Sequence, residues 1–331
     1  MDKKEEILRI LPMRLKEEAG RTASFETLQE IRLRPGRPML FLEAGRERVS
    51  NCLVSEKEIG ECLQYAGNYS LYAYEEELRG GYLTIRGGHR IGLAGQVRAE
   101  QGQVRVLKQV SSLNIRVAHE IKGCAASLLS PLFGDGKLKS VLLISPPGGG
   151  KTTCLRDLIR LMAEGESPVG PVNVGVVDER SELGACYQGI PQNDLGLRSD
   201  VLDGCPKAAG IYMLLRSMAP DVIAVDEISL VSDAEAVEYA AGCGCSFLAT
   251  LHGESEEAVK KRPAIKKLWE QKIFERYVLL GKKPAGRVLG IYNKEFERLF
   301  DRGPERGERA FGQYKNSGSA FDFAGGGRHR E

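Results

Sequence analysis

In residues 121–300, short apolar runs alternate with segments whose apolar residues recur every three or four positions. The runs predict strands buried on both faces, and the periodic segments predict helices packed against them. The predicted strands cover residues 141–144, 172–177, 222–225 and 247–250. We therefore expect an α/β domain with a parallel sheet. Such sheets bind ligands at the carboxyl ends of their strands, so the polar residues after these four strands should converge.

Residues 1–120 show a different pattern, which predicts a smaller α+β domain. Apolar and charged residues alternate over 30–34, and after a Pro-Gly turn an extended run resumes at 39–42, which predicts a half-buried hairpin. Ser55 and Glu58 have the spacing of a capping box at a helix start. Residues 80–98 mix strand formers with glycines, which favours strands joined by tight turns.

Residues 301–331 lack Ile, Leu, Val and Met and are rich in glycine and arginine. Such a segment buries too little apolar surface to fold, so we expect a disordered tail.

The segment from Ser145 to Thr153, SPPGGGKTT, has the features of a Walker A phosphate loop (P-loop) between a strand and an amphipathic helix. Glycines let main-chain N–H groups face a phosphate chain, Lys151 supplies an ammonium, and Thr152 supplies a hydroxyl for Mg2+. Ser145 replaces the usual first glycine, so we expect a turn there that is either slightly strained or differently shaped. The expected nucleotide-binding residues are Pro147, Gly148, Gly149, Gly150, Lys151, Thr152 and Thr153.

Acidic residues follow two other predicted strands. Asp226 and Glu227 end the third strand, where an Asp holds the metal and a Glu polarises the attacking water in P-loop enzymes. Asp178 to Glu182 end the second strand and are either a second set of catalytic acids or a solvated turn. His252 follows the fourth strand, where contact with the γ-phosphate competes with a purely structural role.

Charge and hydropathy narrow the possible partners. The chain has 47 Lys+Arg and 45 Asp+Glu, so no overall basic field suggests nucleic acid, and none is expected as a partner. No apolar stretch approaches the length of a membrane span, and the first residues are unlike a secretory signal. We therefore expect a cytoplasmic protein.

Residues 30–292 resemble the stage III sporulation protein AA family of endospore-forming bacteria. Its members are RecA-like ATPases similar to the motor ATPases of type II secretion, type IV pilus and type IV secretion systems. The resemblance is carried by EIRLRPGRP, GGHRIGLAGQV, SSLNIRVAHEI, SPPGGGKTTCLRDLIR, VVDERSELG, LRSDVLDGCPKAAGIYMLLRSMAPDVIAVDEI and ATLHG.

The resemblance implies roles for particular residues. Glu182 looks like the water-activating acid, with Glu227 as the alternative, and Asp178 joins Thr152 and Asp226 among the metal ligands. His252 would sense the γ-phosphate. Arginines of the N-terminal domain would reach a nucleotide beneath it or in a neighbouring subunit. The candidates are Arg86, Arg90, Arg98 and Arg116, of which we name Arg90 and Arg116 as catalytic.

The resemblance also implies a motor that hydrolyses ATP to ADP and phosphate with Mg2+. It would assemble as a homo-oligomeric ring, expected to be a hexamer, on the cytoplasmic face of a membrane transport complex in endospore formation. Two alternatives stay open: a RecA-like ATPase stimulated by nucleic acid, and a nucleotide-gated scaffold with little turnover.

Overall fold

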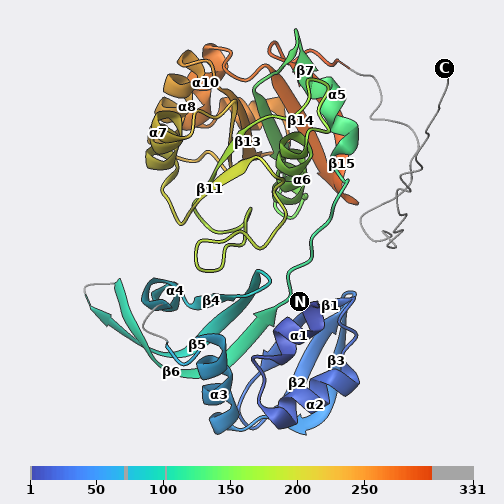
Figure 1. Ribbon diagram of the computed structural model, residues 1–331, viewed down its shortest axis with the longest axis vertical. Coiled ribbons are helices and arrows are strands. Elements are labelled where there is room, and N and C mark those ends of the chain that lie inside the picture. The colour runs from blue at the N-terminus through green and yellow to red at the C-terminus, as the bar shows by residue number, and fades with distance from the viewer. Residues whose placement is uncertain (1, 71–73, 101–102, 300–331) are drawn as a thin grey trace, which may run out of the picture.

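The computed structural model describes residues 2–70, 74–100 and 103–299, which form two large sheets, each with its own helices, and a separate two-stranded sheet (Figure 1). The predicted tail at 301–331 lies outside the described residues. The two parts are joined by a linker at residues 117–123 and also touch through the loop at 179–195. In the described part of the chain, no helix is long and apolar enough to cross a membrane.

The N-terminal sheet is antiparallel, with strand order β3-β2-β1-β6-β5-β4. Alternate strand residues such as Ile31, Leu33 and Phe41 are buried against the helices, so one face carries this core. The strands are β1 (Leu28–Leu33), β2 (Pro38–Glu43), β3 (Arg46–Leu53), β4 (Tyr82–Ile85), β5 (His89–Glu100) and β6 (Gln103–Arg116), and the helices are α1 (Lys3–Leu8), α2 (Met13–Thr22), α3 (Glu56–Ala66) and α4 (Glu75–Arg79).

The local predictions for this part are confirmed. β1 and β2 form the expected hairpin. At the start of α3, Glu58 N donates to the Ser55 hydroxyl while Ser55 N donates to the Glu58 carboxylate, which is the predicted capping box.

The second sheet has the order β11-β10-β12-β13-β9-β14-β15 and is parallel except for β15. Its strands are β9 (Val141–Ser145), β10 (Val174–Asp178), β11 (Ser199–Asp203), β12 (Val222–Val225), β13 (Ser246–His252), β14 (Arg276–Lys282) and β15 (Ala285–Asn293). The four predicted strands correspond to β9, β10, β12 and β13, so the expected α/β class is confirmed. The predictions missed β11, β14 and β15.

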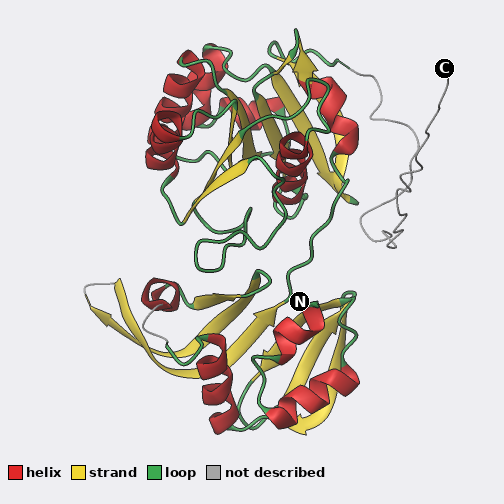
Figure 2. Cartoon of the chain, viewed as in Figure 1, coloured by secondary structure: helices red, strands yellow, loops and turns green. Residues whose placement is uncertain are grey.

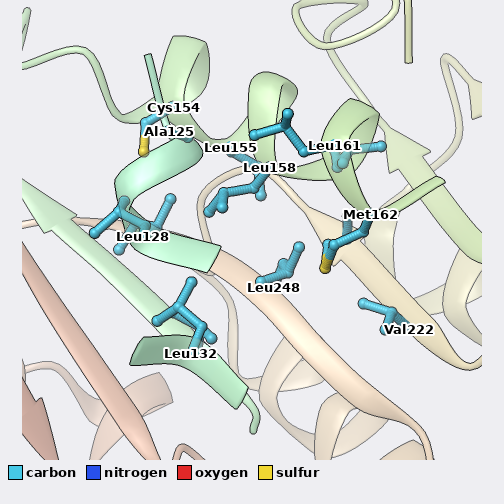
Figure 3. Close-up of a cluster of buried hydrophobic side chains, with 14 of the residues drawn as sticks. Ala125, Leu128, Leu132, Cys154, Leu155, Leu158, Leu161, Met162, Val222 and Leu248 are labelled. Atoms are coloured by element: carbon cyan, nitrogen blue, oxygen red, sulfur yellow. The ribbon is translucent and has the colours of Figure 1, made fainter. Parts of the chain in front are cut away.

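Helices cover both faces of this sheet (Figure 2). Leu155, Leu158 and Met162 of α6 (Lys151–Glu164) pack with Val222 and Leu248 on one face (Figure 3). This face also carries η2 (Ala126–Leu128), α5 (Leu129–Leu132) and the short β7 (Phe133–Gly134) and β8 (Lys137–Leu138), and the opposite face carries α7 (Lys207–Ser217), α8 (Val231–Gly242), α9 (Glu256–Lys260) and α10 (Pro263–Glu270).

These strands are unbroken apolar runs in the sequence because both of their faces are buried. Val141 and Leu143 of β9 point into the α6 core, whereas Leu142 and Ile144 point into the opposite core.

An acidic residue of the first turn caps the start of α8. The helix begins at Val231, and the Asp233 carboxylate accepts from the main-chain N–H groups of Ser229 and Leu230. Asp233 therefore satisfies the N–H groups at this helix start.

One outer strand of each large sheet carries several charges. β3 begins with Arg46, Glu47 and Arg48, and β11 carries Asp200 and Asp203.

Candidate active site

The loop between β9 and α6 makes its turn at glycines. Gly148 and Gly150 have φ of +73° and +83°, a region that favours glycine. Ser145 is instead the buried last residue of β9, and its hydroxyl donates to the Pro146 carbonyl at 3.0 Å. The expectation of strain at Ser145 is therefore wrong. A Cβ at Gly149 would lie 2.8 Å from the Ser145 Oγ, so packing also requires glycine there.

Two threonines orient the carboxylate of Asp226. Its Oδ2 accepts from the Thr152 hydroxyl at 3.0 Å, and its Oδ1 accepts from the Thr250 hydroxyl at 2.5 Å. The Thr250 hydroxyl also accepts from Glu227 N at 2.9 Å. Glu227 has a φ of +43°, which is uncommon for a non-glycine residue and is held here by the surrounding bonds. β12 and β13 thus fix both acids beside the start of α6.

Lys151, His252 and Glu227 form a cluster next to this carboxylate. The Lys151 ammonium donates to His252 Nε2 at 3.2 Å, and a Glu227 carboxylate oxygen lies 3.6 Å from the same nitrogen. His252 Nδ1 is buried and has no hydrogen-bond partner among the described residues. The end of β13 therefore presents a histidine between the lysine and one of the candidate acids.

The Asp178 carboxylate is hydrogen-bonded to the main chain of the segment that follows β10. Its buried carboxylate accepts from the main-chain N–H groups of Glu182, Leu183 and Gly184 at 2.9, 2.9 and 2.7 Å. Burial raises the pKa of the Asp178 carboxyl to about 6, although the three N–H donors favour its ionised form. These bonds tie both oxygens to the main chain, and the expected role of Asp178 as a metal ligand stays a prediction. Asp178 anchors the segment that carries Glu182.

The polar ends of β10, β12 and β13 and the start of α6 meet at one pocket of about 200 Å³. This is the convergence that the parallel sheet predicts. Glu179 pairs with Lys207 on one side of it. The pocket is lined by Lys151, Asp178, Glu179, Arg180, Glu182, Lys207, Asp226, Glu227, Ser229 and His252.

Sequence reasoning missed the β14–β15 hairpin, which contacts the phosphate loop. Gly286 N donates to the Gly149 carbonyl at 2.8 Å. The Lys282 Cε lies 3.9 Å from where a Cβ at Gly148 would stand. The basic turn GKKPAGR at 281–287 was the available signal, but only the pairing of β14 with β9 brings it to the loop.

The candidate arginines of the N-terminal domain do not line this pocket in the described part of the chain. Arg90 lies over the ring of Tyr82 at 3.7 Å, and Arg116 has a largely exposed side chain 3.9 Å from Glu30. Arg98 pairs with Glu100, and Arg86 lines a separate pocket together with Tyr187. Within one chain, the structure brings the phosphate loop and the strand-end acids together but not these arginines.

The sequence profile of the family described as sporulation stage III, protein AA matches residues 1–299. The chain belongs to the stage III sporulation protein AA family. It is 43% identical over 293 residues to the stage III sporulation protein AA of Bacillus subtilis (strain 168), an alignment that covers 88% of this chain and 95% of that protein. The family expected from the sequence is thus confirmed.

Solved structures similar to this family member are secretion and pilus ATPases. The DotB ATPase of Legionella pneumophila matches with a TM-score of 0.50 and 14% identity over 82% of this chain and 75% of that chain. The pilus retraction motor PilT, solved with bound ADP, matches with a TM-score of 0.53 and 17% identity over 80% of this chain and 76% of that chain. At these identities the likeness establishes the fold, and the expected RecA-like P-loop core with a smaller N-terminal domain is confirmed.

Proposed function

We propose that this chain is an ATPase motor that works as a homo-oligomeric ring in endospore formation. It would reside in the cytoplasm and energise a membrane-bound, secretion-like channel through contacts with partners at the membrane. One observation carries the proposal: the Lys151–His252–Glu227 cluster lines one pocket together with Asp226, the carboxylate that Thr152 contacts at the end of the phosphate loop.

The residues present fit a nucleotide with Mg2+. The left-handed glycines and the start of α6 would supply main-chain N–H groups for phosphate oxygens, from Gly148 through Thr153, while Pro147, which has no N–H, would only shape the loop. Thr152 and Asp226 would hold the metal, since a hydroxyl and a carboxylate oxygen already lie together. When bound, Mg2+ supplies charge neutralisation for the phosphates.

The chain's own groups would then divide the chemistry. Lys151 would bind the β- and γ-phosphates, and His252 would contact the γ-phosphate. Glu182 or Glu227 would accept a hydrogen bond from the attacking water and orient it. Glu227 has the more fixed main chain, because Thr250 holds its N–H. Glu182 lies exposed at the pocket's rim on the segment that Asp178 anchors.

The charge of the pocket implies a dependence on Mg2+. Its lining carboxylates outnumber its lysine and arginine side chains. A bare polyphosphate would be repelled by the excess acids, so nucleotide should enter with a divalent cation.

A ring would bring the N-terminal domain of a second chain to this pocket. Within one chain Arg180 lines the pocket, whereas Arg90 and Arg116 lie outside it, so either of these two would act on the nucleotide of a neighbouring subunit.

The proposal is tested with the full chain by measuring phosphate release from ATP with Mg2+ over a range of protein concentrations. We expect hydrolysis whose rate per subunit rises as the protein assembles. Lys151→Ala and Asp226→Asn should each lower the rate by at least about 100-fold. The proposal fails if the folded wild-type chain hydrolyses no ATP at any concentration, or if both variants keep the wild-type rate.

A further inference from the structure

We propose that the loop at residues 179–195 makes ATP turnover depend on the contacts between this loop and the N-terminal domain. Gln192 and Tyr187 would be positioning residues for Glu182. The inference rests on the proposed ATPase function and adds to it a regulatory link within the chain.

The loop is attached to the N-terminal domain by side chains at its far end. The Tyr187 ring packs against that domain's core, and its hydroxyl accepts from Asn68 Nδ2 at 2.7 Å and from the Tyr74 hydroxyl at 3.2 Å. Gly87 N, in the turn between β4 and β5, donates to Gln192 Oε1 at 2.9 Å. The domain therefore binds the loop at two points.

The same loop is braced to the acidic end of β10. The Gly184 carbonyl accepts from Gln192 N at 2.9 Å and from Asn193 N at 3.0 Å. Gly184 N in turn donates to Asp178, whose other oxygen accepts from Glu182 N. One continuous chain of hydrogen bonds thus joins the N-terminal domain to the main chain of a candidate catalytic acid.

A second tie connects this segment to the helix of the phosphate loop. Arg156 of α6 donates to the carbonyls of Leu183 and Glu182, at 2.9 and 2.5 Å. A Cβ at Gly88 would lie only 2.9 Å from the Cβ of Ala185, so the two domains touch closely here. Close packing and bonding on both sides leave little room for the loop to move without the N-terminal domain.

The consequence for catalysis is specific. ATP would be held by the phosphate loop, whose main chain is not part of this path. Loss of the contacts with the N-terminal domain should therefore displace Glu182 and lower kcat, while nucleotide affinity stays unchanged. The test measures the energetic coupling between the two domains directly.

The test compares Gln192→Met, which removes the acceptor for Gly87 N–H, with Gln192→Glu, which keeps one. Both lose the bond from Gln192 Nε2 to the Ile190 carbonyl, and of the two only Gln192→Glu keeps an acceptor for Gly87 N–H, with an added negative charge. Ile190→Val, an exposed position on the same loop, is the control. The readouts are kcat, KM, binding of a non-hydrolysable ATP analogue with Mg2+, and Tm.

We expect Gln192→Met to lower kcat about three- to tenfold with analogue affinity and Tm unchanged, and Gln192→Glu and Ile190→Val to stay near wild type. Tyr187→Phe, which removes the hydroxyl that Asn68 and Tyr74 bind, should lower kcat similarly. Equal kcat in Gln192→Met and wild type would overturn the inference. So would a parallel fall in kcat, affinity and Tm, which indicates a structural role.

Amide hydrogen exchange at residues 182–184 keeps this test separate from the proposed function. Their N–H groups bind Asp178, so exchange should be faster in Gln192→Met than in Gln192→Glu. An inactive wild-type chain with this difference would refute the ATPase proposal alone. An active chain without it would refute the coupling alone.

Discussion

Thr250 serves both acids at the end of β12 with one hydroxyl group. It donates to Asp226 and accepts from Glu227 N, and it is fully buried. A residue that touches neither nucleotide nor metal can thus fix the direction of an expected metal ligand and the backbone of an expected base.

Removing that hydroxyl should therefore impair catalysis without creating a cavity in the core. Thr250→Val keeps the side-chain shape but leaves Glu227 N unpaired and Asp226 free to turn. We expect kcat to fall about 10- to 100-fold and the Mg2+ concentration for half-maximal activity to rise. Thr250→Ser, which keeps the hydroxyl, is the control. Equal losses in both variants would mean that packing of the methyl group, rather than the hydrogen bonds, is what matters.

At the scale of elements, the β14–β15 hairpin brings a lysine to the phosphate loop through long-range pairing. Gly286 fixes the hairpin to Gly149, and Lys282 extends toward Gly148. An ammonium at this position would attract the phosphates of a bound nucleotide.

We therefore expect Lys282→Ala to raise the Kd for ATP with Mg2+ about three- to tenfold, with a smaller effect on kcat. Lys294→Ala removes an exposed lysine just beyond the other end of β15 and is the matched control. Calorimetric titration of both variants checks this, and identical Kd values would exclude Lys282 from nucleotide binding.

His89, the first residue of β5, fastens the linker between the domains. Its Nδ1 accepts from Ala118 N at 3.0 Å, and its Nε2 lies 3.3 Å from Glu6. Burial lowers the His89 pKa to about 4, and the charges of Lys3 and His119 act in the same direction. The folded protein thus holds a neutral imidazole, which keeps Nδ1 as an acceptor despite the nearby Glu6.

The lowered pKa of His89 predicts how the free energy of unfolding depends on pH. Between pH 4 and 6.5 the unfolded state binds more protons at His89 than the folded state does. The free energy of unfolding should therefore rise with pH over that window, and the contribution of His89 should be lost as the pH falls through it. The change from this group is at most about 3 kcal/mol. Denaturant unfolding at several pH values should show a steeper dependence in wild type than in His89→Gln. Parallel curves would contradict the lowered pKa.

At the scale of the whole molecule, the separation of Arg90 and Arg116 from the pocket makes assembly testable. If one of them acts on a neighbouring subunit's nucleotide, its alanine variant and Glu227→Gln should both be nearly inactive alone. Mixing the two should restore part of the hydrolysis, because some interfaces then combine an intact acid with an intact arginine. Each variant at the same total concentration is the control. Absence of recovery for both arginines would place the missing charge elsewhere.

How far the sequence predicts this molecule depends on the range of the interactions. Strands β9, β10, β12 and β13 were predictable because burial on both faces makes every position apolar. The phosphate loop and the Ser55 capping box were also predictable, since their partners lie within a few residues. The main-chain bonds of Asp178 could not be predicted because they depend on how residues 182–184 fold back onto it. Lys282, Tyr187 and Gln192 were missed because their partners are distant in sequence.

The charged outer strands limit how copies of this chain can associate. Both open sheets could in principle grow by adding a strand from another molecule, which leads to fibres rather than closed assemblies. Arg46, Glu47 and Arg48 on β3 and the aspartates on β11 oppose such growth, since an incoming strand would have to accommodate their charge. At these two edges subunits would then meet through side chains alone, which lets them rotate relative to one another and separate without breaking main-chain hydrogen bonds between strands.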